Sequence, residues 1–231
     1  AHPVHRCPHR EEHARAGAQW ARIGREIEAL RSSIDAQTGS VAAQFDRVCA
    51  VLERLGFLEG DRVTASGQRL RRLFGERDLL VAMALDEGTW KDLDEAELAS
   101  MVSALVYDSR SDDDGNELAP TGVGIRLRTA WEECVGTLAR VHRVEKACGC
   151  DPTPSLDAGL MSATLAWAYG STLATAIDGV GIQAGDFVRW MRQVMDCLGQ
   201  IASSAPSSDL ARRAERAKDR IGRGIVAWST I

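Results

Sequence analysis

The chain has 231 residues, of which 45% are hydrophobic, and it carries a formal net charge of −5 at pH 7. This composition allows a sizeable core and excludes a wholly disordered chain. Because the chain is acidic, any contact with nucleic acid must come from a local patch rather than from the global field. No apolar run approaches the roughly 20 residues of a membrane span, so no membrane partner is expected.

The start of the chain and its cysteines predict the cellular context. The first residue is Ala rather than Met and no signal peptide is present, so we expect a fragment of a longer protein or a processed one. Three of the six cysteines, Cys49, Cys134 and Cys197, lie within helical apolar patterns, as buried free thiols do. Nothing resembles a secreted disulfide framework, which predicts a reducing cytoplasm.

The segment AHPVHRCPHREEH (1–13) gathers four of the five histidines around one cysteine. A zinc site needs about four ligands, usually with several thiolates. If a helix begins after Pro8, the two later histidines share a face, and the earlier ligands lie on an extended lead-in. No firm metal site is predicted, and the weak candidates are His5, Cys7, His9 and His13.

A long polar helix is predicted next. Residues 10–36 lack proline and show only a thin apolar stripe, which is typical of a stalk. Gly39 and Ser40 are expected to break this helix. A second helix follows with apolar residues at helical spacing and ends at Gly56. Residues 57–64 then indicate a short hairpin, and Ser66 is expected to start another helix, so this region looks like the end of a winged-helix pattern.

Helices account for the rest of the chain. Residues 66–87 predict one helix, or two that abut at Gly75. Asp94 caps the next helix, with Glu97 as its capping-box partner. An acidic loop covers 108–122. Further helices are expected at about 121–147, 155–169, 171–178 and 184–202, and a last one is capped by Ser208 or Asp209. The predicted fold is an all-α helical bundle with a small winged-helix-like hairpin remnant and a protruding N-terminal stalk helix.

The motifs of several common enzymes are absent. The sequence has no G-x-x-x-x-G-K-[ST] phosphate loop, no G-x-S-x-G elbow and no H-E-x-x-H. Three adjacent carboxylates, Asp112 to Asp114, occur in a soft loop, where nothing desolvates them to shift a pKa. We therefore predict no catalytic residue and no cofactor in this chain.

Two stretches carry a family resemblance. RLRRLFGERDLLVAMALDEGTWKDLDEAELASMVSALVYDSR (69–110) and WAYGSTLATAIDGVGIQAGDFVRWMRQVMDCLGQIA (167–202), followed by RGIV (223–226), resemble the DSHCT helical domain at the C-terminal end of Ski-like superfamily 2 helicases. The segment HPVHRCPHREEHAR and the VT-x-x-G pattern are similar to the actinobacterial HelY type of this family. The resemblance covers about two thirds of the chain.

The resemblance implies a division of the chain. Residues 1–38 correspond to the end of an arch insertion and its returning stalk helix, 39–75 to a winged-helix-like segment, and 76–231 to the DSHCT-type bundle. On this interpretation, residues 1–13 form a structural junction before the stalk rather than a metal site. The implied parent is an ATP-dependent helicase whose RecA-like motor domains, absent here, bind ATP and Mg²⁺ and unwind RNA or DNA. RNA-decay proteins are among its implied partners.

The family implies that one helix contacts the strand leaving the motors, and helix 185–202 has a suitable pattern. Its apolar residues fall within one arc, and a polar stripe runs along the opposite side. Arg189 suits a phosphate or base-face contact, Arg192 and Trp190 flank the stripe, and the family places a polar residue near Asp78. Pairing of Arg189 with a surface carboxylate remains open. The candidate nucleic-acid-binding residues are Arg189, Arg192, Gln193, Asp196, Trp190 and Asp78.

Two functions follow from these observations. The first is a nucleic-acid-guiding accessory domain that lines the exit path of the single strand. The second is a protein-interaction module without direct nucleic-acid contact, which would dock through the acidic loop 108–122 and the thin-striped helix 10–36. The net acidity of the chain favours the second over tight autonomous binding of RNA.

Overall fold

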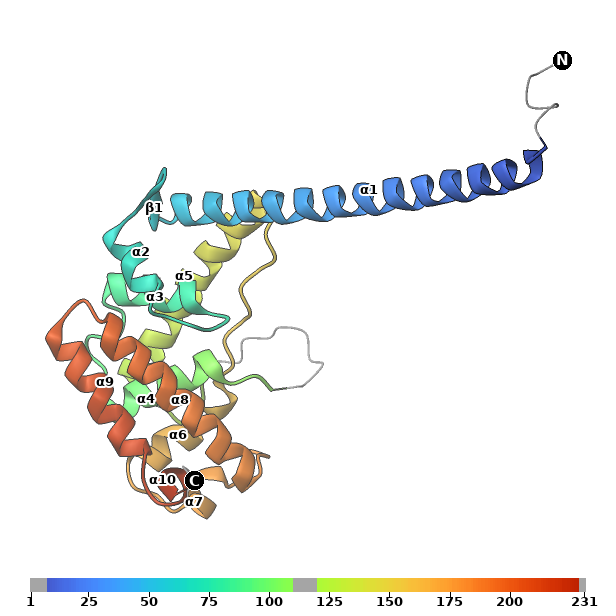
Figure 1. Cartoon of the computed structure of the whole chain (residues 1–231). Coiled ribbons are helices and arrows are strands. Elements are labelled where there is room, and N and C mark those ends of the chain that lie inside the picture. Colours follow the sequence, from blue (N-terminus) through green and yellow to red (C-terminus); the bar gives the residue numbers. More distant parts are fainter. Residues whose placement is uncertain (1–7, 110–119, 229–231) are drawn as a thin grey trace. The chain divides into compact units, whose positions relative to one another are not determined.

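The computed structural model describes residues 8–109 and 120–228. The chain divides into two units between Val48 and Cys49. From Arg10 onward the first unit belongs to α1 (Arg10–Arg54), which is one continuous helix (Figure 1), so the predicted break at Gly39 and Ser40 is wrong. One interior glycine costs a helix only about 1 kcal/mol relative to alanine, and an Ala-, Arg- and Glu-rich helix of 45 residues tolerates this cost.

The second unit, residues 49–231, is the bundle unit, and most of its described residues are helical. The only sheet within the described ranges is one antiparallel hairpin of β1 (Leu58–Glu59) and β2 (Arg62–Val63). The all-α prediction is therefore confirmed. The bundle helices are α2 (Ala65–Leu70), α3 (Asp78–Glu87), α4 (Glu95–Val106), α5 (Ile125–Cys148), α6 (Met161–Ala168), α7 (Leu173–Ile177), α8 (Ala184–Ser204), α9 (Ser208–Ile221) and α10 (Ile225–Trp228).

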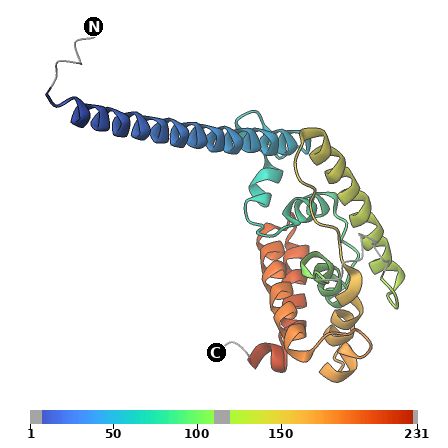
Figure 2. The same cartoon turned by 90° about the vertical axis from the view of Figure 1, so that its right-hand side faces the viewer.

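Helix α4 is the centre of the bundle. It packs against α5, α6, α8 and α9, and Figure 2 shows it between α5 on one side and the α8–α9 pair on the other. All residues from Ala96 to Leu105 are buried, as expected of a helix that is enclosed on every side. Its two buried hydroxyls are satisfied, since Ser100 donates to the carbonyl of Met161 at 2.8 Å and Ser103 to that of Ser100 at 2.7 Å.

The predicted capping box of α4 is confirmed. The Asp94 carboxylate accepts from the backbone N–H of Ala96 and Glu97, and the Glu97 side chain accepts from the backbone N–H of Asp94. Tyr169 donates to Asp94 at 2.8 Å, and Arg126 pairs with Glu97 at 3.0 Å. Burial raises the pKa of Asp94, but these hydrogen bonds and Arg126 outweigh it and lower the pKa below its ordinary value.

Other predicted boundaries differ from the structure. The predicted region 66–87 forms two helices, which was one of the two alternatives. They do not abut at Gly75, because the connector 71–77 separates α2 from α3. Helix α2 starts at Ala65, one residue before the predicted Ser66, and Thr64 caps it. Ser207 rather than Ser208 or Asp209 caps α9, with its hydroxyl accepting from Leu210 N–H at 3.3 Å. Within the described residues, no helix is both long and apolar enough to span a membrane.

The VT-x-x-G pattern has a structural explanation in the hairpin. The Thr64 hydroxyl accepts from the Gly67 N–H at 3.2 Å and donates to the Gly56 carbonyl at 2.8 Å, which joins the start of α2 to the end of α1. A Cβ on Gly67 would lie 2.3 Å from the Phe57 carbonyl oxygen and 2.7 Å from Val63 Cγ1. Only glycine therefore allows α2 to approach the hairpin this closely.

We expect Gly67→Ala to lower the free energy of unfolding of the bundle unit by about 1–3 kcal/mol, the usual cost of an overpacked contact. Denaturant titration followed by circular dichroism measures this loss. Gly75→Ala is the matched control, because a Cβ there meets nothing within 4 Å and Gly75 does not have positive φ. Equal stability of the two variants would contradict the packing explanation.

Candidate nucleic-acid interface along helix α8

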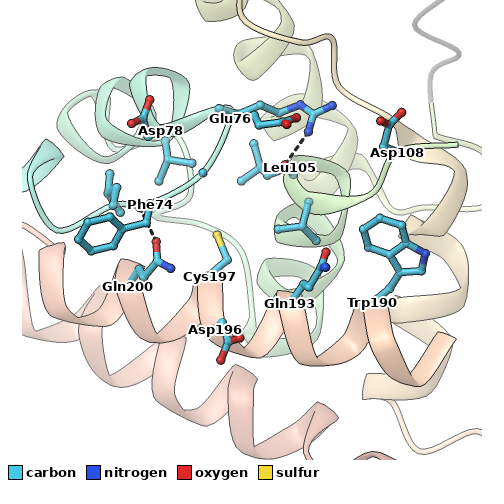
Figure 3. Close-up of a pocket in the computed structure, with 15 residues that line it drawn as sticks. Phe74, Glu76, Asp78, Leu105, Asp108, Trp190, Gln193, Asp196, Cys197 and Gln200 are labelled. Carbon is cyan, nitrogen blue, oxygen red and sulfur yellow. Dashed lines mark hydrogen bonds between the residues drawn. The ribbon is translucent and has the colours of Figure 1, made fainter. Parts of the chain in front are cut away.

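A groove with a volume of about 450 Å³ runs along one side of α8 in the bundle unit. Figure 3 shows α8 as one wall, with the connector 71–77, the start of α3 and the end of α4 opposite it. The groove is lined by Leu73, Phe74, Gly75, Glu76, Arg77, Asp78, Val81, Leu105, Val106, Asp108, Trp190, Gln193, Asp196, Cys197 and Gln200.

Four of the six residues predicted to contact nucleic acid meet at this groove. Trp190, Gln193 and Asp196 come from α8, and Asp78 comes from the first turn of α3, more than 100 positions earlier. The three α8 residues follow one another at intervals of three positions, which places them on one side of the helix. The predicted set therefore includes one spatial cluster, to which the two predicted arginines do not belong.

Arg189 lies beside this cluster and is not among its lining residues. Its Nη2 is 3.5 Å from Asp186 Oδ1, and its guanidinium carbon lies 4.6 Å from the centroid of the Trp190 ring. The predicted alternative, a pairing with a surface carboxylate, is thus present. Because both side chains of the pair are about half exposed, the pair contributes little stability and leaves the guanidinium accessible.

Arg192 has a different environment. The residue is half-buried, and its Nη2 is covered by protein without a hydrogen-bond partner among the described residues. A covered guanidinium nitrogen of this kind is costly unless something satisfies it. The structure therefore gives Arg192 no open face comparable with that of Arg189.

Trp190 forms one end of the groove. The residue is half-buried, and its ring meets Tyr107 edge to face at 5.2 Å between centroids, a preferred arrangement for aromatic pairs. Because Tyr107 and the Arg189 guanidinium both contact this ring, Trp190 has a defined position. A fixed, partly exposed indole is suited to stacking on a flat ligand.

Phe74 forms the opposite end and was missed by the sequence analysis. Its side chain is 77% exposed, and its backbone N–H donates to Gln200 Oε1 at 2.7 Å. The neighbouring Arg72 donates to the Ser203 carbonyl at 2.9 Å. These bonds attach the connector to the last turns of α8 and hold an apolar ring toward solvent. The only local signal was Gly75, which marked the end of a helix.

The groove is rich in hydrogen-bond acceptors. Four carboxylates line it, from Glu76, Asp78, Asp108 and Asp196, and burial raises the pKa of Asp78. Arg77 is the only cation among the lining residues, and its donors are taken by main-chain carbonyls. Burial raises the pKa of the Cys197 thiol to about 12, so this group stays protonated at neutral pH.

His9 and His13, the N-terminal histidines that the structure describes, are not among the residues that line the groove. His9 and His13 lie at the start of α1 with ring centroids 6.2 Å apart, and His9 Nδ1 is 3.3 Å from Glu12. His5 and Cys7 lie outside the described residues. Among the residues that are described, no three His, Cys, Asp or Glu side chains are grouped as metal ligands would be. The weak metal candidates therefore remain a sequence-based hypothesis.

Three motifs that carried the family resemblance meet in one cluster near the start of α8. Trp167, from WAYG, is buried and donates through Nε1 to the Ile221 carbonyl at 2.9 Å. Phe187, from GDFVR, meets the Trp167 ring edge to face at 5.8 Å. Arg223, from RGIV, stacks at 3.6 Å over the same ring and donates to the carbonyls of Trp167 and Ser171. These motifs position α8 within the bundle.

The fold and the groove together define an all-α bundle module with an elongated, acceptor-rich surface site along one helix. The family model of the DSHCT (NUC185) domain matches residues 60–229. The chain therefore belongs to the DSHCT family.

Relatives of this chain are helicases by name. It is 37% identical over 240 aligned residues to "Probable helicase HelY" of Mycobacterium tuberculosis, which covers 98% of this chain and 26% of that protein. The "Probable helicase HelY" of Mycobacterium leprae is 36% identical over 74% of the chain and 20% of that protein. The "DExH-box ATP-dependent RNA helicase DExH10" of Arabidopsis thaliana is 22% identical over 100% of the chain and 24% of that protein.

These findings confirm the predicted resemblance to the C-terminal region of Ski-like helicases of the HelY type. The chain spans about a quarter of the length of these curated relatives. It shares with them the DSHCT domain, an accessory domain of this helicase family.

Proposed function

We propose that this chain guides single-stranded nucleic acid as the accessory domain of an ATP-dependent RNA or DNA helicase. The strand leaves RecA-like motor domains, which bind ATP and Mg²⁺, and passes along α8. One observation carries the proposal: Trp190, Gln193, Asp196 and Asp78, chosen from the sequence for this role, line the same groove. RNA-decay proteins are the further partners we propose, and the free thiols of the described cysteines favour the cytoplasm as the location.

The domain division belongs to the same proposal. Residues 1–38 are the end of an arch insertion with its returning stalk helix, 39–75 the winged-helix-like segment, and 76–231 the bundle. The apolar stripe of α1 supports the stalk assignment, because Trp20, Ile23, Ile27 and Leu30 recur at spacings of three and four residues and are 79%, 43%, 44% and 64% exposed. Such a narrow stripe suits packing against another helix.

The guiding role predicts a specific kinetic defect. In the intact helicase that contains this chain, Arg189→Ala is expected to lower the rate of strand unwinding severalfold and leave nucleic-acid-stimulated ATP hydrolysis within about twofold. The guanidinium next to Trp190 holds the strand on its path, whereas ATP is hydrolysed in the motor domains. Helicase and ATPase assays on the same preparation measure both rates.

The chain provides a matched control for this variant. Arg212 on α9 forms an i,i+3 pair with Asp209 at 3.5 Å and has 61% of its side chain exposed. Arg189 pairs with Asp186 at the same spacing and distance, with 52% exposed. Arg212→Ala is expected to change neither rate. Equal losses of unwinding and ATP hydrolysis in Arg189→Ala would refute the guiding role.

A protein-interaction module is the second candidate, and the exposed stripe of α1 is the observation that favours it. Residues 110–119 of the acidic loop that would also dock lie outside the described residues. If this candidate is correct, the chain retains a protein partner in a pull-down after nuclease treatment, and substitution of Trp20 and Leu30 by Ser releases that partner. Retention that depends on intact nucleic acid would support the guiding role instead.

A further inference from the structure

We propose that Cys148 and Cys150 form a redox pair, which a hydroperoxide joins in a disulfide, and that this bond controls how firmly the segment after α5 is held. Residues 149–157 make up this segment, which we call the strap, and Figures 1 and 2 show it running from the end of α5 toward α6. Neither cysteine lines the groove along α8, so the redox pair is a second site of the bundle unit, separate from the groove.

The end of α5 brings the two cysteines close together. Gly149 separates them and has φ 71° and ψ 31°, the left-handed helical conformation. This conformation sets the Cα atoms of its two neighbours as far apart as those of residues i and i+2 in an α-helix, which is about 5.4 Å. A disulfide joins residues whose Cα atoms are about 4.4–6.8 Å apart. The backbone therefore allows a bond between Cys148 and Cys150 with only a local rearrangement.

The cap of α5 favours the same side for both thiols. The N–H of Cys150 donates to the Glu145 carbonyl at 3.0 Å, and that of Gly149 donates to the Lys146 carbonyl at 3.2 Å, which are the two bonds of a Schellman motif. In this motif the residue after the glycine commonly packs back over the last turn of the helix. Cys148 lies three positions after Glu145, on the face of that turn. Both cysteines are half-buried, so a small oxidant can reach them.

The oxidation balances with a hydroperoxide as the oxidant. One thiolate attacks the peroxide, the O–O bond breaks, and the sulfur becomes a sulfenic acid while the departing oxygen takes up a proton to form water. The second thiolate then attacks this sulfur, the S–O bond breaks, and a second water leaves as the disulfide forms. With hydrogen peroxide, two thiols are oxidised and one peroxide is reduced to two molecules of water.

A disulfide at this position would be labile, as a regulatory bond must be. The loop that it closes contains only Gly149, so the bond gains little from restricting the unfolded chain. Closing so small a ring also strains the bond, and strained disulfides are reduced more easily. In the reducing cytoplasm proposed above, thiols such as glutathione return the pair to the dithiol once the peroxide is consumed.

The strap transmits the oxidation to the bundle. Glu145 is buried and holds the strap twice: its carbonyl accepts from Cys150, and its carboxylate accepts from the N–H and the hydroxyl of Thr153 at 2.9 and 2.6 Å. Two residues further on, the Ser155 carbonyl accepts from Arg77. A disulfide requires the two Cβ atoms to lie about 3.8 Å apart, which draws Cys150 away from the Glu145 carbonyl. Oxidation therefore loosens the strap at Thr153 and weakens its contact with Arg77.

Mass spectrometry tests the redox pair. The 231-residue chain is treated with a small excess of hydrogen peroxide at neutral pH, denatured, labelled with iodoacetamide and cleaved with trypsin, which leaves both cysteines in the peptide 147–189 with no other cysteine. We expect this peptide to lose the mass of two hydrogens and to take up no label, and dithiothreitol to reverse both changes. Cys134, whose pKa is raised by burial to about 12, should remain a thiol and take up the label. Full labelling of Cys148 and Cys150, or bonds from them to other cysteines, would overturn the proposal.

Hydrogen exchange tests the control of the strap. The Thr153 N–H should exchange severalfold faster in the oxidised chain than in the reduced chain, because its hydrogen bond to Glu145 opens more often. Peroxide should change neither the mass of the peptide by two hydrogens nor this exchange in Cys150→Ser. Cys49→Ser, which removes a half-buried thiol from α1, should respond as the unmodified chain does. Equal exchange in the two redox states would overturn the control of the strap. Faster exchange that persists in peroxide-treated Cys150→Ser would assign the effect to another oxidised residue and would overturn it as well.

Discussion

Replacing Trp167 with alanine is expected to lower the free energy of unfolding of the bundle unit by about 3–5 kcal/mol. The ring is 3% exposed and contacts Phe187 and Arg223. Its removal leaves a cavity between α6, α8 and the end of α9. It also leaves the Ile221 carbonyl without the indole N–H that now donates to it at 2.9 Å. Lost burial and an unsatisfied buried acceptor act in the same direction.

Urea titration followed by far-UV circular dichroism measures this loss. Trp20→Ala is the control, since the same substitution on α1 removes a ring that is 79% exposed and should change stability by no more than about 0.5 kcal/mol. Trp167→Phe should fall between the two, because it keeps most of the apolar contact and loses the hydrogen bond. A loss below about 1 kcal/mol for Trp167→Ala would show that the three motifs do not depend on this ring.

The helices could be predicted because their signals are local. The Asp94 and Glu97 capping box and the glycine that ends the second predicted helix, Gly56, are each determined by residues within one turn, and both are present. The break within 66–87 could not be placed in this way. The connector 71–77 is held by Gln200 and by the Ser203 carbonyl, which are 126 and 131 positions away. Hydrogen bonds to residues distant in the sequence thus determine where α2 ends and α3 begins, and the local pattern of apolar residues does not contain this information.

The site could be predicted in part for the same reason. The helical spacing of α8 identified Trp190, Gln193 and Asp196, and these do share the groove. The opposite wall comes from other segments, so neither Phe74 nor Asp108 was expected. Arg189 was expected at the centre of the polar stripe. It lies outside the lining, where its guanidinium contacts the Trp190 ring and pairs with Asp186.

Arg77→Met is expected to lower the free energy of unfolding by about 2–6 kcal/mol, because it leaves two carbonyls without donors at about 1–3 kcal/mol each. Arg77 is 6% exposed and joins three segments: its own position before α3, the Leu105 carbonyl at the end of α4, and the Ser155 carbonyl in the segment after α5. Methionine keeps a long apolar side chain but donates to neither carbonyl. One wall of the groove should loosen as a result.

Because Arg77 holds one wall of the groove, the Arg77→Met variant tests both the stability of the bundle unit and the binding of nucleic acid. Hydrogen exchange should show faster exchange in the first turn of α3 and at the end of α4, and a single-stranded oligonucleotide should bind less tightly even where the chain remains folded. Arg71→Met is the matched control, because the exposed side chain of that arginine, in the same connector, donates to Gln68 at 2.9 Å and to no other side chain or carbonyl among the described residues. Arg77→Lys should recover only part of the loss, since one ammonium does not reproduce a fork that reaches both carbonyls. If Arg77→Met were as stable as Arg71→Met, the two carbonyls must find other donors, and the groove wall would not depend on Arg77.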